Sequence, residues 1–263
     1  MIPQAYITEW SQKVPWQSNE QVEQDLVVCR ALVEIFSDEW LASSLAFRGG
    51  TALHKLYLNP PPRYSEDIDL VQVRAEPIKE TIQKLQSVLT FLSDASIKPR
   101  KDGIRLNYRF ESEFPPTQIL RLKVEANTRE HFSVLKYQQF PFVLDSRWYD
   151  GKCDITTYKL EELLGTKLRA LYQRKKGRDL FDLYIALTEK PGLDKDLILK
   201  SYREYMSFSV DHHPSRKEFI LNMNDKMKES EFLGDTTGLL RPQVPYKPQE
   251  AYEIVRTELI EQI

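Results

Sequence analysis

Two short stretches decide the fold of this chain: Phe47-Arg48-Gly49-Gly50-Thr51 and Ser65-Glu66-Asp67-Ile68-Asp69-Leu70. The first is the end of an apolar run that stops at two glycines, and residues 51–58 after it have the pattern of a helix. Glycine lets the backbone approach a ligand closely, and the free N–H groups at the start of a helix attract an anion. The turn alone is weak evidence, because two glycines before a helix more often form a plain tight turn. It matches neither a Walker loop nor a dinucleotide fingerprint.

The two aspartates of the second stretch strengthen the case for a phosphate site. Residues 67–73 alternate between polar and apolar, which predicts a strand with Asp67 and Asp69 on one face and their Cα atoms about 7 Å apart. Two carboxylates on one face repel each other, whereas a bound cation stabilises both. Mg²⁺ takes oxygen ligands and bridges carboxylates to substrate phosphates. The alternative is the polar outer face of an edge strand, but the position shortly after the glycine turn favours a metal site.

A third carboxylate lies on a later strand. Residues 104–110 and 119–126 alternate in the same way and predict two further strands. Glu125 shares a face with Arg121 and Lys123 on the second of them. Glu125 therefore either completes the metal site or pairs with surface charges, and the sequence leaves both possibilities open.

The C-terminal half of the chain is predicted to be helical. One helix is expected from residue 159 to 176, with Gly177 as its C-cap, and another over 178–188. Mixed strands and helices come first and helices alone follow, which predicts an α+β domain over 1–155 and a helical domain over 156–263.

Three charged residues of this helical half could form a cluster. Asp179 and Asp182 are three positions apart, so they face the same way on a helix. Lys167 lies on the preceding helix, and a lysine held by an aspartate is a fixed positive charge for a triphosphate. The alternative is a structural role, in which Asp179 only interacts favourably with the dipole of its helix.

Composition places few limits on function. The chain has 263 residues, of which 41% are hydrophobic and 29% charged, and its net charge of -2 gives no overall argument for nucleic-acid binding. Residues 159–179 are locally basic, which suits a solvated helix face, a polyphosphate or an RNA backbone. Two distant cysteines exclude a disulfide framework and a zinc cage, so a reducing cytoplasm is expected. No signal peptide and no apolar run of roughly 18 residues is seen, so no membrane association is expected.

The combined pattern resembles the AbiEii/AbiGii family of nucleotidyltransferase toxins. The matching blocks are residues 47–55, 63–70 and 123–125, and Lys167 with 178–184. The resemblance implies a polymerase-β-like nucleotidyltransferase core with a mixed sheet, followed by a mainly helical C-terminal domain. It also implies the toxin of a bacterial toxin–antitoxin or abortive-infection (phage-defence) pair, with a cognate antitoxin encoded nearby. Some relatives add nucleotides to tRNA 3′ ends, and others are known mainly for binding nucleotides.

Site residues are carried over position by position. The resemblance implies that Gly50 and Thr51 hold the triphosphate of an NTP substrate, with Gly50-Thr51 standing where the wider superfamily has Gly-Ser. It implies catalytic roles for Asp67, Asp69, Lys167 and Asp182, a Mg²⁺ or Mn²⁺ site on Asp67, Asp69 and Glu125, and nucleotide contacts from Gly49, Gly50, Thr51, Lys55, Lys167, Arg178 and Asp179. The helical domain is thus expected to contribute Lys167 and Asp182 to the site.

Two other functions compete with nucleotide transfer. A metal-dependent nuclease of the restriction type has an acid, one residue and then a lysine, whereas here Lys123-Val124-Glu125 has the reverse order. A nucleotide sensor on the same fold would bind NTP without transfer. Intact Asp67, Asp69 and Lys167 favour the transferase, with an RNA acceptor, most simply a tRNA.

Overall fold

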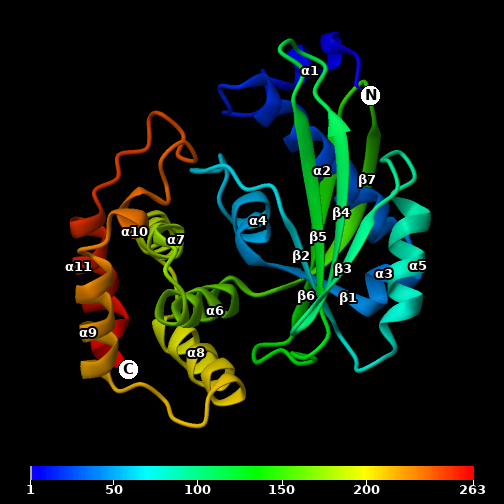
Figure 1. The fold of residues 1–263 in the computed structure, drawn as a ribbon. Coiled ribbons are helices and arrows are strands. Elements are labelled where there is room, and N and C mark those ends of the chain that lie inside the picture. The colour runs from blue at the N-terminus through cyan, green and yellow to red at the C-terminus, as the bar shows by residue number, and fades with distance from the viewer. Residues whose placement is uncertain (1) are drawn as a thin grey trace. The chain divides into compact units, whose positions relative to one another are not determined.

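A computed structural model describes residues 2–263 and resolves them into two compact units (Figure 1). Of the described residues, unit 1 contains 2–132 and 137–158, and unit 2 contains 133–136 and 159–263. Unit 1 holds a seven-stranded mixed sheet, and unit 2 is helical. The predicted α+β class with a helical C-terminal part is confirmed. No helix within residues 2–263 combines the length and the apolar character needed to cross a membrane.

Unit 1 is built from one sheet and several helices. Its helices are α1 (Gln4–Trp10), α2 (Asn19–Ser37), α3 (Glu39–Ser44), α4 (Gly49–Ala52), the π-helical turn η1 (Leu53–Tyr57) and α5 (Ile78–Val88). Its strands are β1 (Leu45–Arg48), β2 (Ile68–Gln72), β3 (Ser96–Arg100), β4 (Gly103–Glu111), β5 (Ile119–Asn127), β6 (Tyr137–Asp145) and β7 (Asp150–Tyr158).

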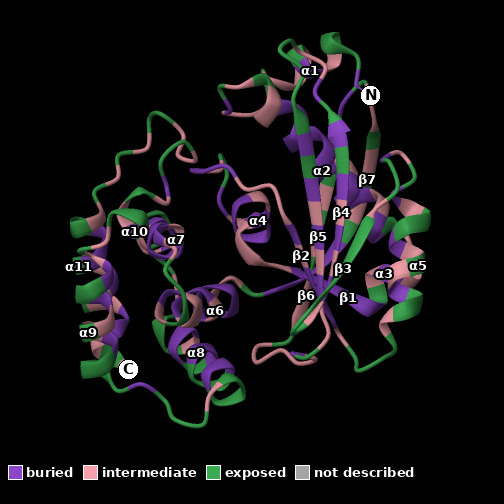
Figure 2. Ribbon diagram, viewed as in Figure 1, coloured by how far each residue is buried: buried purple, intermediate pink, exposed green. Residues whose placement is uncertain are grey.

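The sheet places β2 at its centre, in the order β3-β4-β5-β2-β1-β7-β6. β2 pairs antiparallel with β1 and parallel with β5. Ile68 and Leu70 of β2 are buried, as is Val124 of β5, whereas Asp69, between Ile68 and Leu70, is partly exposed (Figure 2). This alternation orients Asp69 away from the apolar face, because successive strand residues point to opposite sides.

Capped helices pack on this sheet. The Ser18 side chain accepts a hydrogen bond from the Gln21 N–H at the start of α2, and Asp38 accepts one from Leu41 at the start of α3. α2 packs against β5, β6 and β7, α3 packs against α5, and α4 packs against β1 and β2. Figure 1 shows α4 and α5 on opposite sides of the sheet. The short helix α4 is thereby placed directly beside the strand that carries Asp69.

Unit 2 is a helical assembly. It contains α6 (Leu160–Gln173), α7 (Gly177–Glu189), α8 (Lys195–Ser209), α9 (Arg216–Lys226), α10 (Ser230–Gly234), α11 (Pro248–Glu258) and the 3₁₀ turn η2 (Ile260–Gln262). α6 packs against α7 and α8, and α7 packs against α11. The core is apolar, with Leu168, Phe181 and Tyr202 almost completely buried.

The prediction that Gly177 ends the preceding helix is wrong. α6 ends at Gln173, and Gly177 is the first residue of α7. A Cβ at Gly177 would lie 2.0 Å from the carbonyl oxygen of Phe232. Glycine is therefore required by the close approach of the α10 backbone, a contact between residues distant in sequence.

A second glycine contact gives a test of packing in unit 2. A Cβ on Gly165 of α6 would lie 2.6 Å from the Ser201 Cβ and 2.8 Å from the Ile198 carbonyl oxygen of α8. Gly165→Ala should therefore overpack this contact and lower the free energy of unfolding, measured by urea denaturation, by about 1–3 kcal/mol. Gly234→Ala is the matched control, since its Cβ would meet nothing within 4 Å. Equal stability of the two variants would contradict the close packing of α6 on α8.

Candidate functional site

The turn between β1 and α4 lies directly against Asp69. Register pairs Arg48 of β1 with Asp69 of β2, and Gly49 follows with a φ of +81°. A Cβ on Gly49 would lie 2.3 Å from Oδ2 of Asp69. Position 49 therefore requires glycine for two reasons. Its backbone is left-handed, and the Asp69 carboxylate occupies the space that a side chain would need. The glycine turn and the aspartate strand form one structural unit.

The loop before Asp67 packs against the second glycine. A Cβ on Gly50 would lie 2.7 Å from Nη2 of Arg63 and 3.2 Å from Oγ of Ser65. Arg63 is only 2% exposed, and its Nη1 donates to the Tyr64 carbonyl at 2.9 Å. The role of Arg63 as a buried support for the turn was not found from the sequence, because it depends on a contact with Gly50.

Thr51 ties α4 to the backbone of Asp67. Its Oγ1 donates to the Asp67 carbonyl oxygen at 2.5 Å and lies 2.9 Å from Oγ of Ser65. The side chain is buried. The Thr51 hydroxyl therefore fixes the position of the first aspartate, whereas its N–H belongs to the first turn of α4, where N–H groups have no helical partner.

Of the three predicted metal-binding carboxylates, Asp69 and Glu125 lie on the neighbouring strands β2 and β5, and Asp67 directly precedes β2. In the parallel register of β2 and β5, Asp69 is opposite Glu125. The Lys123 Nζ lies 3.0 Å and 3.4 Å from the two carboxylate oxygens of Asp67. Glu125 accepts a hydrogen bond from Nε of Arg105 at 2.6 Å. Both Asp67 and Glu125 are therefore paired with a cation from the same sheet.

Two of these carboxylates fit a divalent cation. Asp67 and Asp69 supply hard oxygen ligands, the kind that Mg²⁺ and Mn²⁺ prefer. Lys123 shows that the space beside Asp67 accepts a positive charge. Within residues 2–263 no group of three or more His, Cys, Asp or Glu side chains is arranged to enclose a metal ion. Mg²⁺ is commonly bound through one or two carboxylates, with water and phosphate oxygens as its other ligands, which two aspartates match.

Arg48 is an additional cation beside Asp69. Its Nη1 forms an ion pair with Glu130. Burial opposes the Arg48 charge, but Glu130, Tyr158 and Asp69 outweigh burial and raise the pKa of Arg48. Sequence reasoning assigned Arg48 no role, although its position directly before Gly49 was a usable signal.

Lys55, a predicted nucleotide contact, has a partner inside unit 1. Its Nζ lies 2.7 Å from Oδ1 of Asp25, which is 3% exposed. Burial opposes the Lys55 charge, but Asp25 outweighs it and raises the pKa of Lys55. Asp25 also accepts hydrogen bonds from Trp10 and Trp16 at 3.1 and 2.9 Å. This cluster connects η1 to α1 and α2.

The predicted cluster around Lys167 exists in unit 2. The Lys167 Nζ lies 3.1 Å from Asp179 and 2.7 Å from Asp182. Both aspartate side chains have no exposed surface, and the Lys167 side chain is 7% exposed. Arg174 adds two hydrogen bonds to Asp179, at 2.6 and 2.7 Å. Burial opposes ionisation of Asp179, but Lys167 and Arg174 outweigh burial and lower the pKa of Asp179.

Arg178 is also paired within unit 2. Its Nε and Nη2 donate to the two carboxylate oxygens of Asp235 at 2.8 and 3.0 Å, and its backbone N–H donates to Asp235 at 3.1 Å. The hydrogen bonds from Arg178 contribute most to lowering the pKa of Asp235 against the effect of burial. Arg178 thereby holds the start of α7 to the residue that follows α10.

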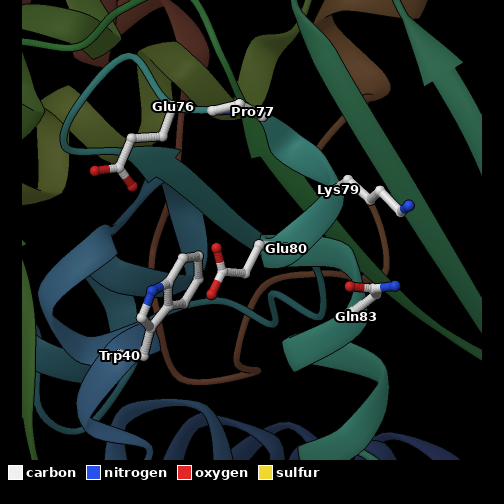
Figure 3. Close-up of a pocket in the computed structure, with 6 residues that line it drawn as sticks. All are labelled: Trp40, Glu76, Pro77, Lys79, Glu80 and Gln83. Carbon is white, nitrogen blue, oxygen red and sulfur yellow. The ribbon is translucent and has the colours of Figure 1, made fainter.

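A surface hollow lies elsewhere in unit 1. Figure 3 shows Trp40 of α3 and Glu80 of α5 pointing toward one another, with Glu76 on the adjoining loop. The lining is completed by Pro77, Lys79 and Gln83. None of the predicted site residues lines this hollow, so it takes no part in the site described above.

Comparisons with known proteins agree on the fold. The sequence model of the family described as nucleotidyl transferase AbiEii toxin, type IV toxin–antitoxin system, matches residues 30–255. MenT4, a nucleotidyltransferase toxin from Mycobacterium tuberculosis H37Rv, has a structure similar to this chain with a TM-score of 0.70 and 16% identity, over 100% of this chain and 91% of that one. JHP933 from Helicobacter pylori gives a TM-score of 0.57 at 21% identity, with 94% of each chain covered. No curated protein sequence matches the chain.

The buried cluster of unit 2 gives a test by pH. A carboxylate whose pKa is lowered in the folded state stabilises the fold above the ordinary carboxyl pKa of about 3.9, and this stabilisation is lost as pH falls through the folded value. Asp179→Asn should therefore lower the free energy of unfolding by about 3–5 kcal/mol at pH 7, because it breaks a buried ion pair. In urea denaturation between pH 7 and pH 3, the difference from wild type should shrink at the acid end.

The control for this test is Asp225→Asn. Asp225 pairs with Lys228 on the surface, and both side chains are more than half exposed. Exposed pairs contribute only about 0–1 kcal/mol, so this variant should follow wild type throughout. A stability loss for Asp179→Asn that stays constant from pH 7 to pH 3 would show that the Asp179 charge is not the cause.

Proposed function

This chain belongs to the AbiEii family of nucleotidyltransferase toxins of type IV toxin–antitoxin systems, and we propose that it transfers a nucleoside monophosphate from an NTP to the 3′ end of a tRNA. The observation that carries the proposal is the close approach of Gly49 to the Asp69 carboxylate. A Cβ on Gly49 would lie 2.3 Å from Oδ2 of Asp69. It joins a turn suited to phosphate and a carboxylate suited to a cation in one place. Nucleotide transfer needs both at once.

The proposed reaction is a displacement at the α-phosphorus of the NTP. The 3′-hydroxyl oxygen of the acceptor forms a bond to this phosphorus and gives up its proton to solvent water, while the bond to the β-phosphate oxygen breaks and pyrophosphate leaves. A divalent metal ion, Mg²⁺ or Mn²⁺, when bound would polarise the phosphate and offset the charge of the pyrophosphate. Asp67 and Asp69 would hold this ion, and the backbone N–H groups of Gly50 and Thr51 would orient the phosphates.

The charges around the two aspartates support this assignment. The Lys123 and Asp67 side chains are 32% and 39% exposed, so the pair that they form is accessible and weak. Lys123 can therefore leave Asp67 and contact a substrate phosphate. For Glu125 to become a third ligand of the metal ion, Arg105 would have to leave it in the same way, and we propose this exchange for the substrate-bound state.

Residues of the helical unit are proposed to serve the same reaction. Lys167 would neutralise the phosphates, with Asp182 holding its ammonium in place. The nucleotide contacts proposed for Lys55, Arg178 and Asp179 rest on the family resemblance. Each of these side chains is paired within its own unit, so each would act by exchanging a partner or by holding its neighbours in position.

The toxin family also suggests the cellular setting. A type IV toxin has a cognate antitoxin, and we propose one for this chain. NTPs and tRNA are both found in the cytoplasm, where the protein would act. Loss of functional tRNA 3′ ends would then slow growth until the antitoxin relieves the effect, which suits a role in phage defence.

The metal-binding pair gives the first test of the function. With radiolabelled NTPs, Mg²⁺ and total bacterial tRNA, wild type should label the RNA, and Asp67→Asn or Asp69→Asn should abolish labelling. Both variants should keep the far-UV circular dichroism of wild type, because the lost charge binds a cation and not a protein core. Asp150→Asn changes an exposed carboxylate of β7 and should label RNA normally. Labelling near the wild-type level by either site variant would refute the assignment, and NTP binding without labelling by wild type would indicate a sensor.

Lys167 and Asp182 give the second test. Preorganised charge contributes about 3–4 kcal/mol to the transition state, so Lys167→Ala should lower turnover roughly a hundred- to a thousandfold. Asp182→Ala should be comparable, and the double variant should lose little more, because groups that act as a unit are not additive. Turnover is measured per folded molecule, with the folded fraction taken from circular dichroism. Multiplicative losses in the double variant would show that the two residues act separately.

A further inference from the structure

One face of the sheet in unit 1 is strongly basic. In the antiparallel pairing of β3, β4 and β5, Lys98 is opposite Arg105, and Arg109 is opposite Arg121. The basic face is defined here by six side chains: Lys98, Arg100, Arg105, Arg109, Arg121 and Lys123. The net charge of the whole chain is -2, so the concentration of positive charge is local.

Burial shows that this face is open. Along β4 and β5 the alternate residues Leu106, Tyr108, Leu122 and Val124 are buried, and the residues between them are exposed or partly exposed. Four of the six basic side chains, those of Lys98, Arg100, Arg109 and Arg121, are exposed, and none of these four forms an ion pair within the described part of the chain. Their charges are therefore available to a ligand.

The Arg109–Arg121 pair is unfavourable for the fold. The two arginines are directly opposite on neighbouring antiparallel strands, and like charges in this position destabilise a sheet. The two arginines also bury no shared apolar surface that could offset this repulsion, because both are exposed. A ligand that carries negative charge would remove the repulsion and gain from both side chains.

The basic face is continuous with the candidate site. The row that begins with Lys98 on β3 continues through Arg105 on β4 and Glu125 on β5 to Asp69 on β2. Neighbouring strands are about 4.8 Å apart, so this row extends about 14 Å from the sheet edge to Asp69. Lys123, which contacts Asp67, lies on the same face of β5, two residues before Glu125. A chain of phosphates could follow this row to the aspartates.

We propose that the basic face binds the sugar–phosphate backbone of the RNA acceptor, next to the 3′ end that receives the nucleotide. This inference rests on the proposed function and identifies the surface that its acceptor would use. Arginine suits the role, because its planar fork matches phosphate oxygens bidentately. An acidic protein segment is the competing ligand, but it would bring further carboxylates toward Asp67, Asp69 and Glu125. A nucleic-acid strand instead brings a hydroxyl, the group that the reaction needs.

The test compares two double variants of the full-length protein. Arg109→Ala/Arg121→Ala removes the opposed pair, and Lys79→Ala/Lys152→Ala is the matched control, since both lysines are exposed elsewhere in unit 1. Binding of fluorescently labelled bulk bacterial tRNA is measured from 50 to 200 mM salt. The test variant should bind at least about tenfold more weakly, and the slope of log K against log salt should fall by about 1.4–1.8, as for two lost phosphate contacts. The control should match wild type.

Two further measurements separate binding from folding and chemistry. Arg109→Ala/Arg121→Ala should melt at the wild-type temperature or above it, since it relieves a repulsion, and Arg109→Lys/Arg121→Lys should retain most of the affinity. In transfer assays the KM for tRNA should rise in the Ala variant, with the KM for NTP and the kcat at saturating tRNA unchanged.

The outcomes distinguish this inference from the proposed function. Transfer to tRNA by wild type, with an unchanged acceptor KM and an unchanged salt slope in the test variant, would overturn the basic face as the acceptor surface and leave the function intact. Salt-dependent binding that the test variant loses, without transfer by wild type, would support the surface and refute the function. Loss of binding to polyglutamate but not to tRNA would assign the face to an acidic protein and overturn the proposal.

Discussion

The close approach of Gly49 to the Asp69 carboxylate constrains everything around the candidate site. It requires a left-handed residue without a side chain at the end of β1, and it fixes the antiparallel register that places Arg48 opposite Asp69. Thr51 and Arg63 then secure the loop that delivers Asp67. The glycine turn and the aspartate strand are separate in the sequence but pack directly against each other. They can do so because the Asp69 carboxylate occupies the space that a side chain at position 49 would need.

Both units contain a lysine held by aspartate, but the two pairs differ in what they can do. Lys123 and Asp67 are about one-third exposed, and an exposed ion pair contributes only about 0–1 kcal/mol, so a substrate can displace it. Lys167 lies between two fully buried aspartates, where removing one partner costs about 3–5 kcal/mol. The first pair is therefore suited to exchange, and the second to holding a charge in a fixed place.

The distribution of charge reconciles a net charge of -2 with the polyanionic acceptor that we propose. Several cations of both units are paired with a carboxylate of their own unit, as Lys55 is with Asp25 and Arg178 is with Asp235. The basic face of β3, β4 and β5 differs in that four exposed cations, which form no ion pair within residues 2–263, lie together on neighbouring strands. Net charge averages over paired and unpaired cations, so composition alone gave no indication of the surface that we propose for RNA.

The sequence by itself determined the elements that depend on local pattern. Alternation along residues 104–110 and 119–126 predicted two strands. The two glycines followed by Asp67 and Asp69 predicted a phosphate-binding turn beside a metal site. Both predictions were possible because strand period and ligand type are properties of neighbouring residues. Helical spacing also predicted that Asp179 and Asp182 face the same way, and both contact Lys167 in the structure.

Only the tertiary structure decided which side chains meet across elements. β3 was not predicted, because Ser96–Arg100 is exposed throughout and contains a proline, so it shows no alternation and forms a strand only by pairing with β4. Gly177 was read as a helix end, whereas the backbone of Phe232 explains it. The opposition of Arg109 and Arg121 depends on register between β4 and β5. Such contacts join residues far apart in sequence, and packing of the whole chain fixes them.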